Sequence, residues 1–299
     1  RSVLSAPLIT AAAISGRTER IKIGTAVQIL PLGNPLRIAE EVATLDHVSG
    51  GRFEFGIGRS GLPGAYEGYN MSYGESRERF FESLEIIKQA FTKDYFSYDG
   101  KYHSYDNVCL TPKPLQNPYP PMRVAATTSE TFPVLGKMGM PIFVGLRGLA
   151  LSDVETQVKS YTYSMKQAGE NVPNVHLRVP VHVATSTQEA MRNSEQSFMK
   201  QFRRLGSQLG SSVNKETADS VNERSDRSQR LSEIRWEDIQ GEKVAVGDPE
   251  TVTKQLKKMK NSLNLSGFAL EFNAGEIIPP DKVKESLTLF CKEVMPELR

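Results

Sequence analysis

Residues 21–61 read IKIGTAVQILPLGNPLRIAEEVATLDHVSGGRFEFGIGRSG and hold a strand, a helix and a second strand in succession. The first ten residues are rich in β-branched and apolar side chains, which is typical of a strand. Asn34 is a good helix N-cap, Pro35 suits the first helical position, and Gly50 suits the stop. Residues 53–58 then alternate phenylalanine and isoleucine with Glu54 and glycine. Because parallel strands need a crossover, this order predicts a parallel βαβ unit.

The same alternation continues along the chain and predicts an α/β fold, either a wound sheet or a (β/α) barrel. Capping-box residues Ser72 and Glu75 predict the start of a second long helix. The proline-rich residues 95–121 read as irregular, and the polar residues 210–241 read as a mobile lid or insertion within a single domain of residues 1–299. Further strands are expected at residues 122–127, 140–145, 175–185 and 266–272, with helices at 151–169, 187–206, 248–261 and 280–295.

Composition excludes several classes of protein. With 37 Lys and Arg against 35 Asp and Glu, the net charge is +2, so bulk charge favours neither nucleic acid nor a membrane surface as a partner. Cys109 and Cys291 are far apart, which gives no support for a disulfide framework or a zinc site and favours a reducing, cytoplasmic location. No apolar run is long enough to cross a membrane, and the four histidines lack metal-ligand spacing.

Polar groups at the carboxyl ends of predicted strands are the candidate site, because parallel α/β folds place their sites at that edge. Arg59 follows the strand at residues 53–58, Arg77 lies near the next helix start, and Thr127, Thr128 and Ser129 end another strand. Guanidinium groups and a hydroxyl-rich helix start suit a phosphate. Each also has a structural interpretation: the arginines as surface or salt-bridge residues, and the Thr-Thr-Ser turn as an N-cap.

The motifs within residues 20–60, together with PPMRVAATTSET and CKEVMPEL further on, resemble the bacterial luciferase-like flavin monooxygenases. This resemblance runs from near residue 2 to residue 298. It implies a TIM (β/α)8 barrel that binds reduced flavin mononucleotide (FMN). It also implies that Arg59 and Arg77 hold the flavin phosphate with Thr128, Ser129 and Thr131, and that Thr127 lies beside the ribityl chain.

The resemblance further implies that the strand GTAV passes under the flavin ring with a cis peptide between Ala26 and Val27. Gly58 stands where the luciferases proper have a reactive cysteine near the flavin face. The family begins with a strand, a helix and a second strand that ends in a catalytic histidine pair, and this sequence begins after that point. We therefore expect a barrel without those three elements, an N-terminally incomplete chain, and a family histidine upstream of Arg1, so the catalytic residues stay unknown.

The leading hypothesis is an FMN-dependent, two-component monooxygenase. A separate flavin reductase would supply reduced FMN, and O2 and a small apolar substrate such as an aldehyde or ketone would be consumed. The alternatives are a hydride-transferring oxidoreductase dependent on the deazaflavin F420, a non-catalytic flavin-binding protein, and a partner subunit. The family usually forms homo- or heterodimers through the helices that correspond to residues 4–16 and 35–48. Trp236 reads as an anchor of the polar segment or as a flavin or substrate contact.

Overall fold

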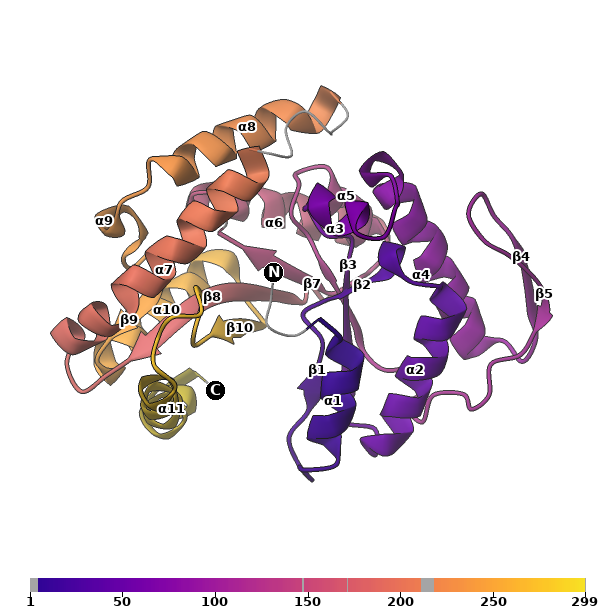
Figure 1. Cartoon of the computed structure of the whole chain (residues 1–299), viewed down its shortest axis with the longest axis horizontal. Helices are drawn as coiled ribbons and strands as arrows, with labels where there is room; N and C mark the ends of the chain where they lie inside the picture. Colours follow the sequence, from indigo (N-terminus) through magenta and orange to yellow (C-terminus); the bar gives the residue numbers. More distant parts are fainter. Residues whose placement is uncertain (1–4, 147, 171, 211–217, 299) are drawn as a thin grey trace. The chain divides into compact units, whose positions relative to one another are not determined.

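The computed structural model describes residues 5–146, 148–170, 172–210 and 218–298, and it divides into two compact units, Arg1–Ala125 and Ala126–Arg299 (Figure 1). Each unit is described by itself. Within the described part of the chain, none of the helices combines the length and hydrophobicity of a membrane span.

The first unit is built around β3 (Phe53–Gly58), whose side chains are mostly buried. Strand β3 pairs in parallel with β1 (Ile23–Gly24), β2 (Gln28–Ile29) and β6 (Met122–Ala125). Helix α2 (Pro35–Val48) connects β2 to β3, and the Asn34 side chain accepts a hydrogen bond from the Arg37 amide at 3.1 Å. The parallel strand–helix–strand unit and its N-cap are therefore confirmed.

The predicted strand at residues 21–30 is interrupted, because only its two ends form ladders with β3. Between them the Ala26–Val27 peptide is cis, as the resemblance implies. The Thr25 hydroxyl donates to the Gly56 carbonyl at 2.7 Å and keeps the connection close to β3. A 3-10 turn, Leu30–Leu32, then leads to α2.

Three helices complete the helical part of this unit: α1 (Pro7–Ser15), α3 (Pro63–Glu67) and α4 (Ser76–Thr92). The predicted capping box at Ser72 and Glu75 is wrong. Ser72 precedes a 3-10 turn, Tyr73–Glu75, and neither the Ser72 nor the Glu75 side chain makes a capping hydrogen bond to the helix backbone. The long helix begins at Ser76, which is fully buried.

The prediction that residues 95–121 are irregular is wrong for its first half. Strands β4 (Phe96–Asp99) and β5 (Ser104–Val108) form an antiparallel hairpin. Its turn is held by Glu82 of α4, whose carboxylate accepts hydrogen bonds from the amides of Lys101, Tyr102 and His103 at 2.7–3.3 Å. Because this anchor comes from another element, local patterns do not reveal it.

The second unit is built around β8 (Val175–Val183), which pairs in parallel with β7 (Ile142–Gly145), β9 (Ala245–Gly247) and β10 (Gly267–Glu271). The helices expected at residues 151–169, 187–206, 248–261 and 280–295 form with shifted ends, and a shorter helix precedes them. They are α5 (Thr131–Lys137), α6 (Leu151–Gln167), α7 (Thr187–Gly210), α10 (Pro249–Leu263) and α11 (Pro280–Leu289), the last continued by turns over Phe290–Val294 and Met295–Leu298.

The polar segment at residues 210–241 is largely helical where the structure describes it. Helix α8 (Ala218–Ser232) lies along α7, and α9 (Trp236–Ile239) follows it (Figure 1). Leu231, Trp236 and Ile239 are buried in one cluster with residues of α7, so the expectation that the segment lies outside the core is wrong for its C-terminal half. The burial of Trp236 agrees with its interpretation as an anchor. Residues 211–217 lie outside the described residues, and the lid role stays a prediction.

Candidate functional site

Arg59 is held at the carboxyl end of β3 by two contacts within the first unit. Its Nη1 donates to the Ser76 hydroxyl at the start of α4 at 3.2 Å, and its guanidinium carbon lies 5.6 Å from the centre of the Tyr73 ring. Among the described residues, no carboxylate pairs with Arg59. The half-buried guanidinium therefore keeps hydrogen-bond donors for an anion.

Two tyrosines that the sequence analysis did not single out support this arginine. The Tyr66 hydroxyl donates to the Arg59 carbonyl, and the Tyr66 and Tyr73 rings meet edge to face at 5.2 Å. Burial raises the pKa of the Tyr66 hydroxyl, so it stays protonated and remains a donor. The sequence signal that could have identified these two tyrosines is the presence of aromatic residues in a glycine-rich loop, because such a loop needs apolar side chains to hold it on the core.

Arg77 is the second residue of α4 and directly follows Ser76, the partner of Arg59. The structure thus brings the side chain of the residue before Arg77 into contact with the Arg59 guanidinium. Arg79, one turn further, has a different role: it pairs with Glu75 at 2.9 Å and its guanidinium lies over the Tyr102 ring. Arg79, which the sequence analysis did not consider, is therefore a structural residue.

Gly58 is explained by a close packing contact with the cis segment. A Cβ atom at this position would lie 2.6 Å from Cγ2 of Val27, which is closer than van der Waals contact allows. A cysteine at Gly58 would therefore displace Val27. Glycine is required at this position because a larger side chain would collide with Val27. A role of Gly58 beside a cofactor stays a prediction.

The hydroxyl cluster at residues 127–131 belongs to the second unit. Thr128 is buried, its hydroxyl shares a hydrogen bond with that of Thr131 at 2.8 Å, and its carbonyl accepts from the Thr131 amide at 3.0 Å. Ser129 is exposed, and α5 begins at Thr131. The Thr127 carbonyl accepts from Nη1 of Arg227 at 2.9 Å. The turn is therefore ordered by its own hydroxyls and by an α8 arginine that sequence reasoning missed.

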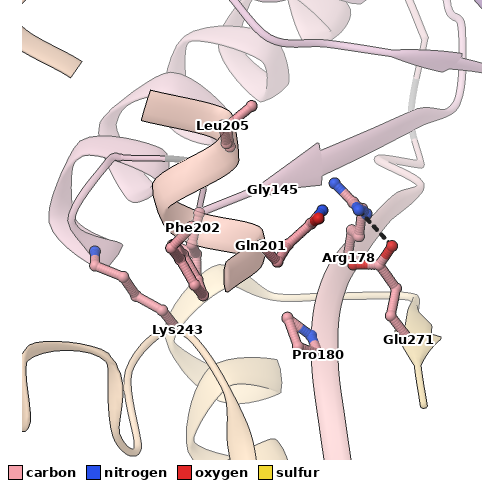
Figure 2. A pocket seen from close by; sticks show the side chains of 9 residues that line it. Gly145, Arg178, Pro180, Gln201, Phe202, Leu205, Lys243 and Glu271 are labelled. Atoms are coloured by element: carbon pink, nitrogen blue, oxygen red, sulfur yellow. Dashed lines mark hydrogen bonds and ion pairs between the residues drawn. The ribbon is translucent and has the colours of Figure 1, made fainter. Parts of the chain in front are cut away.

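A pocket with polar and apolar walls lies within the second unit (Figure 2). It is small, with a cavity volume of about 30 Å³. Arg178 of β8 and Glu271 at the end of β10 form an ion pair in its wall. The other lining residues are Gly145, Leu146, Pro180, Gln201, Phe202, Leu205 and Lys243. The sequence analysis did not identify this pocket, because its residues come from distant segments.

His182 of β8 is a core residue, as its apolar strand suggests, but it differs from a fully hydrogen-bonded histidine. It is buried, its Nδ1 has no hydrogen-bond partner among the described residues, and burial lowers its pKa. Within the described ranges, no group of three His, Cys, Asp or Glu side chains is placed to hold a metal ion.

The sequence profile described as luciferase-like monooxygenase matches residues 1–264. The chain belongs to this family. An uncharacterized protein of Sinorhizobium fredii is 36% identical over 42% of this chain, and the match spans only 36% of that relative's length. The alkanal monooxygenase alpha chain of Photorhabdus luminescens is 24% identical over 99% of this chain and 83% of the relative.

Solved structures of similar proteins show that the chain has the family's fold, which confirms the predicted α/β class. A monooxygenase from Streptomyces bottropensis superposes with a TM-score of 0.80 at 22% identity, covering 98% of this chain and 83% of its own. The FMN-bound oxygenating component of 3,6-diketocamphane monooxygenase from Pseudomonas putida superposes with a TM-score of 0.78 at 18% identity. This match covers 98% of this chain and 84% of the relative. An F420-dependent secondary alcohol dehydrogenase superposes with a TM-score of 0.75 at 17% identity, and the match covers 99% of this chain and 84% of the relative.

Proposed function

We propose that this protein is a flavin-dependent monooxygenase that uses reduced FMN and O2 to oxygenate a small apolar substrate, an aldehyde or ketone in the simplest case. The observation that carries the proposal is Arg59, a half-buried guanidinium at the end of a parallel strand, without a carboxylate partner among the described residues. Family membership and a relative named alkanal monooxygenase support it.

The residues around Arg59 fit the phosphate end of FMN. Ser76 and Tyr73 fix the guanidinium in direction, and Tyr66 fixes the backbone that carries it. An arginine oriented in this way meets a phosphate dianion with little loss of side-chain entropy. Arg77, the next residue after Ser76, is proposed as the second phosphate contact. Thr127, Thr128, Ser129 and Thr131 stay predicted contacts, as do Ala26, Val27 and Gly58 beside the ring.

Reduced FMN, when bound, would supply the electrons that activate O2. This chain's own part is to hold the cofactor, to orient the substrate and to exclude water from the reacting groups. A separate reductase is the proposed source of reduced flavin. The catalytic acid or base stays unassigned.

The proposal is tested by anaerobic titration with reduced FMN and with reduced riboflavin, which lacks the phosphate. Arg59→Ala is expected to weaken FMN binding about tenfold or more, because a charge-assisted hydrogen bond is lost, and to leave riboflavin binding nearly unchanged. Arg79→Ala is the matched control, since Arg79 already pairs with Glu75, and it should bind FMN like the wild type.

Equal losses for both flavins in Arg59→Ala, or no loss at all, would contradict the phosphate role. A parallel titration with reduced F420 separates the hydride-transferring alternative: F420 binding without FMN binding would move the assignment there. FMN binding without any oxygenated product from a panel of aldehydes and ketones would favour the non-catalytic flavin-binding protein.

We also propose that the protein forms a dimer through the face of α1 and α2. Ile9 and Ile14 of α1 and Val48 at the end of α2 are exposed apolar side chains, and the two helices pack against each other. Exposed apolar residues gathered on neighbouring helices are typical of a protein interface.

A further inference from the structure

Helix α8 approaches the rest of the second unit closely at two glycines, and this fixes its position. A Cβ atom at Gly206 of α7 would lie 2.9 Å from the Leu231 Cβ atom. One at Gly148, in the loop before α6, would lie 3.1 Å from the Arg227 carbonyl oxygen. The Ser228 hydroxyl donates to the Gly206 carbonyl at 2.9 Å. Leu231 and Ser228 thus attach α8 to α7, and this attachment does not require a buried guanidinium.

Arg227 is nevertheless buried. Its exposed fraction is 6%, and its Nη1 donates to the Thr127 carbonyl at 2.9 Å. Burial of a guanidinium charge costs free energy that only well-placed acceptors offset. Arg230, one turn further along α8, is exposed and pairs with Asp153 at 3.4 Å, so an arginine of this helix does not have to be buried. The contact with Thr127 is therefore the feature of Arg227 that needs an explanation.

This contact orients one peptide unit of the hydroxyl turn. The peptide bond between Thr127 and Thr128 is trans, so the Thr127 carbonyl and the Thr128 N–H point in opposite directions. Arg227 holds the carbonyl toward α8 and thereby turns the N–H away from α8. A cation at the carbonyl oxygen also polarises the peptide unit, which strengthens its N–H as a donor.

The Thr128 N–H makes no hydrogen bond to any other residue that the structure describes, although Thr128 is only 3% exposed. Backbone donors of buried residues are rarely left without an acceptor. An acceptor from outside the chain would complete this amide. A phosphate oxygen suits it, because a polarised N–H donates most strongly to a charged acceptor.

We propose that Arg227 is a positioning residue for a phosphate group: it holds the Thr127 carbonyl so that the Thr128 N–H donates to a phosphate oxygen. Without Arg227 the peptide unit is free to rotate, and its carbonyl oxygen would then face the phosphate and repel it. Arg227 thus acts through Thr128 and not by contact with the phosphate. That the phosphate is the end of FMN rests on the proposed function.

The orientation of the peptide unit is tested on the flavin-free protein by NMR. The three-bond coupling between the amide and α protons of Thr128 depends on its φ angle. Arg227→Met keeps a long side chain but has no donor, and it should change this coupling. Arg230→Met, a change on the same helix away from the turn, is the control and should leave the coupling as in the wild type. An unchanged coupling in Arg227→Met overturns the proposal.

The effect on binding is measured by anaerobic titration with reduced FMN and with reduced riboflavin. Arg227→Met is expected to weaken FMN binding about fivefold or more and riboflavin binding less than about twofold, because only FMN has the phosphate. Arg227→Lys should bind FMN within about twofold of the wild type, because an ammonium group can still donate to the Thr127 carbonyl. Arg230→Met should bind both flavins like the wild type.

Equal losses for both flavins in Arg227→Met would mean that Arg227 only packs α8 in place. A loss in Arg227→Lys as large as in Arg227→Met would exclude rescue through the carbonyl. Either result overturns the proposal. A wild type that binds FMN no better than riboflavin overturns both this proposal and the phosphate role of Arg59, whereas a wild-type preference for FMN that Arg227→Met retains overturns this proposal alone.

Discussion

Arg52 connects α1 to the start of β3 through one guanidinium group. Its side chain donates to the carbonyls of Ser15, Thr18, Ile21 and Ser49 and to the Thr18 hydroxyl at 2.7–3.1 Å. The Ser15, Thr18 and Ile21 carbonyls lie at or after the end of α1, and the Ser49 carbonyl lies at the end of α2, where helices leave their acceptors unpaired. Arg52 is therefore a structural residue of the same sequence block that carries Arg59.

Arg52→Lys is expected to destabilise the protein by about 1–3 kcal/mol, because an ammonium group offers three donors and cannot reproduce the planar arrangement. The measurement is the free energy of unfolding in urea. The matched control is Arg37→Lys on α2, whose side chain is exposed and makes only surface ion pairs, and a change within about 0.5 kcal/mol is expected there. Equal effects in both variants would contradict the assigned role.

His182 makes the folding stability of the second unit depend on pH. Burial lowers its pKa below the model-peptide value of about 6.5, and Glu189, Lys282 and Glu285 act on it more weakly. The unfolded chain therefore binds a proton near pH 6.5 that the folded chain does not bind until lower pH. Stability is complete above pH 6.5 and falls on acidification, by at most about 1.4 kcal/mol per pH unit from this group.

His182→Leu should reduce this acid sensitivity between pH 6.5 and pH 5. The acid sensitivity is measured as the change in the urea unfolding midpoint with pH. Unfolding is followed by the fluorescence of Trp236, the single tryptophan, which lies in the same unit. His47→Gln, a change at an exposed histidine of the first unit, should keep the wild-type pH dependence. An unchanged acid slope in His182→Leu would show that other groups cause it.

At the scale of elements, α8 is the case in which the sequence pattern and the observed packing disagree. Its sequence is strongly polar, and this led to the expectation of a segment outside the core. Three apolar residues near its end and in α9 pack in one cluster with residues of α7, and the Ser228 hydroxyl of α8 donates to the Gly206 carbonyl of α7 at 2.9 Å. A polar helix can thus belong to a core by a narrow stripe, because its remaining faces stay in water.

Leu231→Ala tests whether α8 is a packed element. Leu231 is fully buried against α7, so the truncation is expected to cost about 2–5 kcal/mol of unfolding free energy. Urea unfolding followed by Trp236 fluorescence measures it, with Gln229→Ala on the exposed face of α8 as the control. A cost below 1 kcal/mol would identify α8 as a loosely held lid.

At the scale of the whole molecule, the proposed dimer gives a measurable mass. Light scattering coupled to size-exclusion chromatography should report about twice the 33.2 kDa of the chain. Ile9→Glu should shift the mass toward the monomer, because a charge then replaces the most exposed isoleucine of α1. Val172→Glu, an equally exposed apolar position in the second unit, is the control and should leave the mass unchanged. A monomeric wild type would contradict the proposal.

The sequence by itself determined the parallel α/β class and the N-cap and bounds of α2, and its resemblance to a known family implied that family and the cis position at Ala26–Val27. These features follow from local rules, namely alternation, capping and a contiguous motif, so they can be read without tertiary contacts. The sequence also singled out Arg59, because a charged residue at the end of an apolar strand is conspicuous.

Only the tertiary structure decided that Arg79 pairs with Glu75, what holds the β4–β5 hairpin, and that α8 packs on α7. It alone brought Arg178, Gln201 and Glu271 to one pocket, from positions up to 93 residues apart. Such contacts join side chains that are distant in sequence, and their free energies depend on burial and mutual orientation. No local pattern encodes either quantity, because both arise only when the chain is folded.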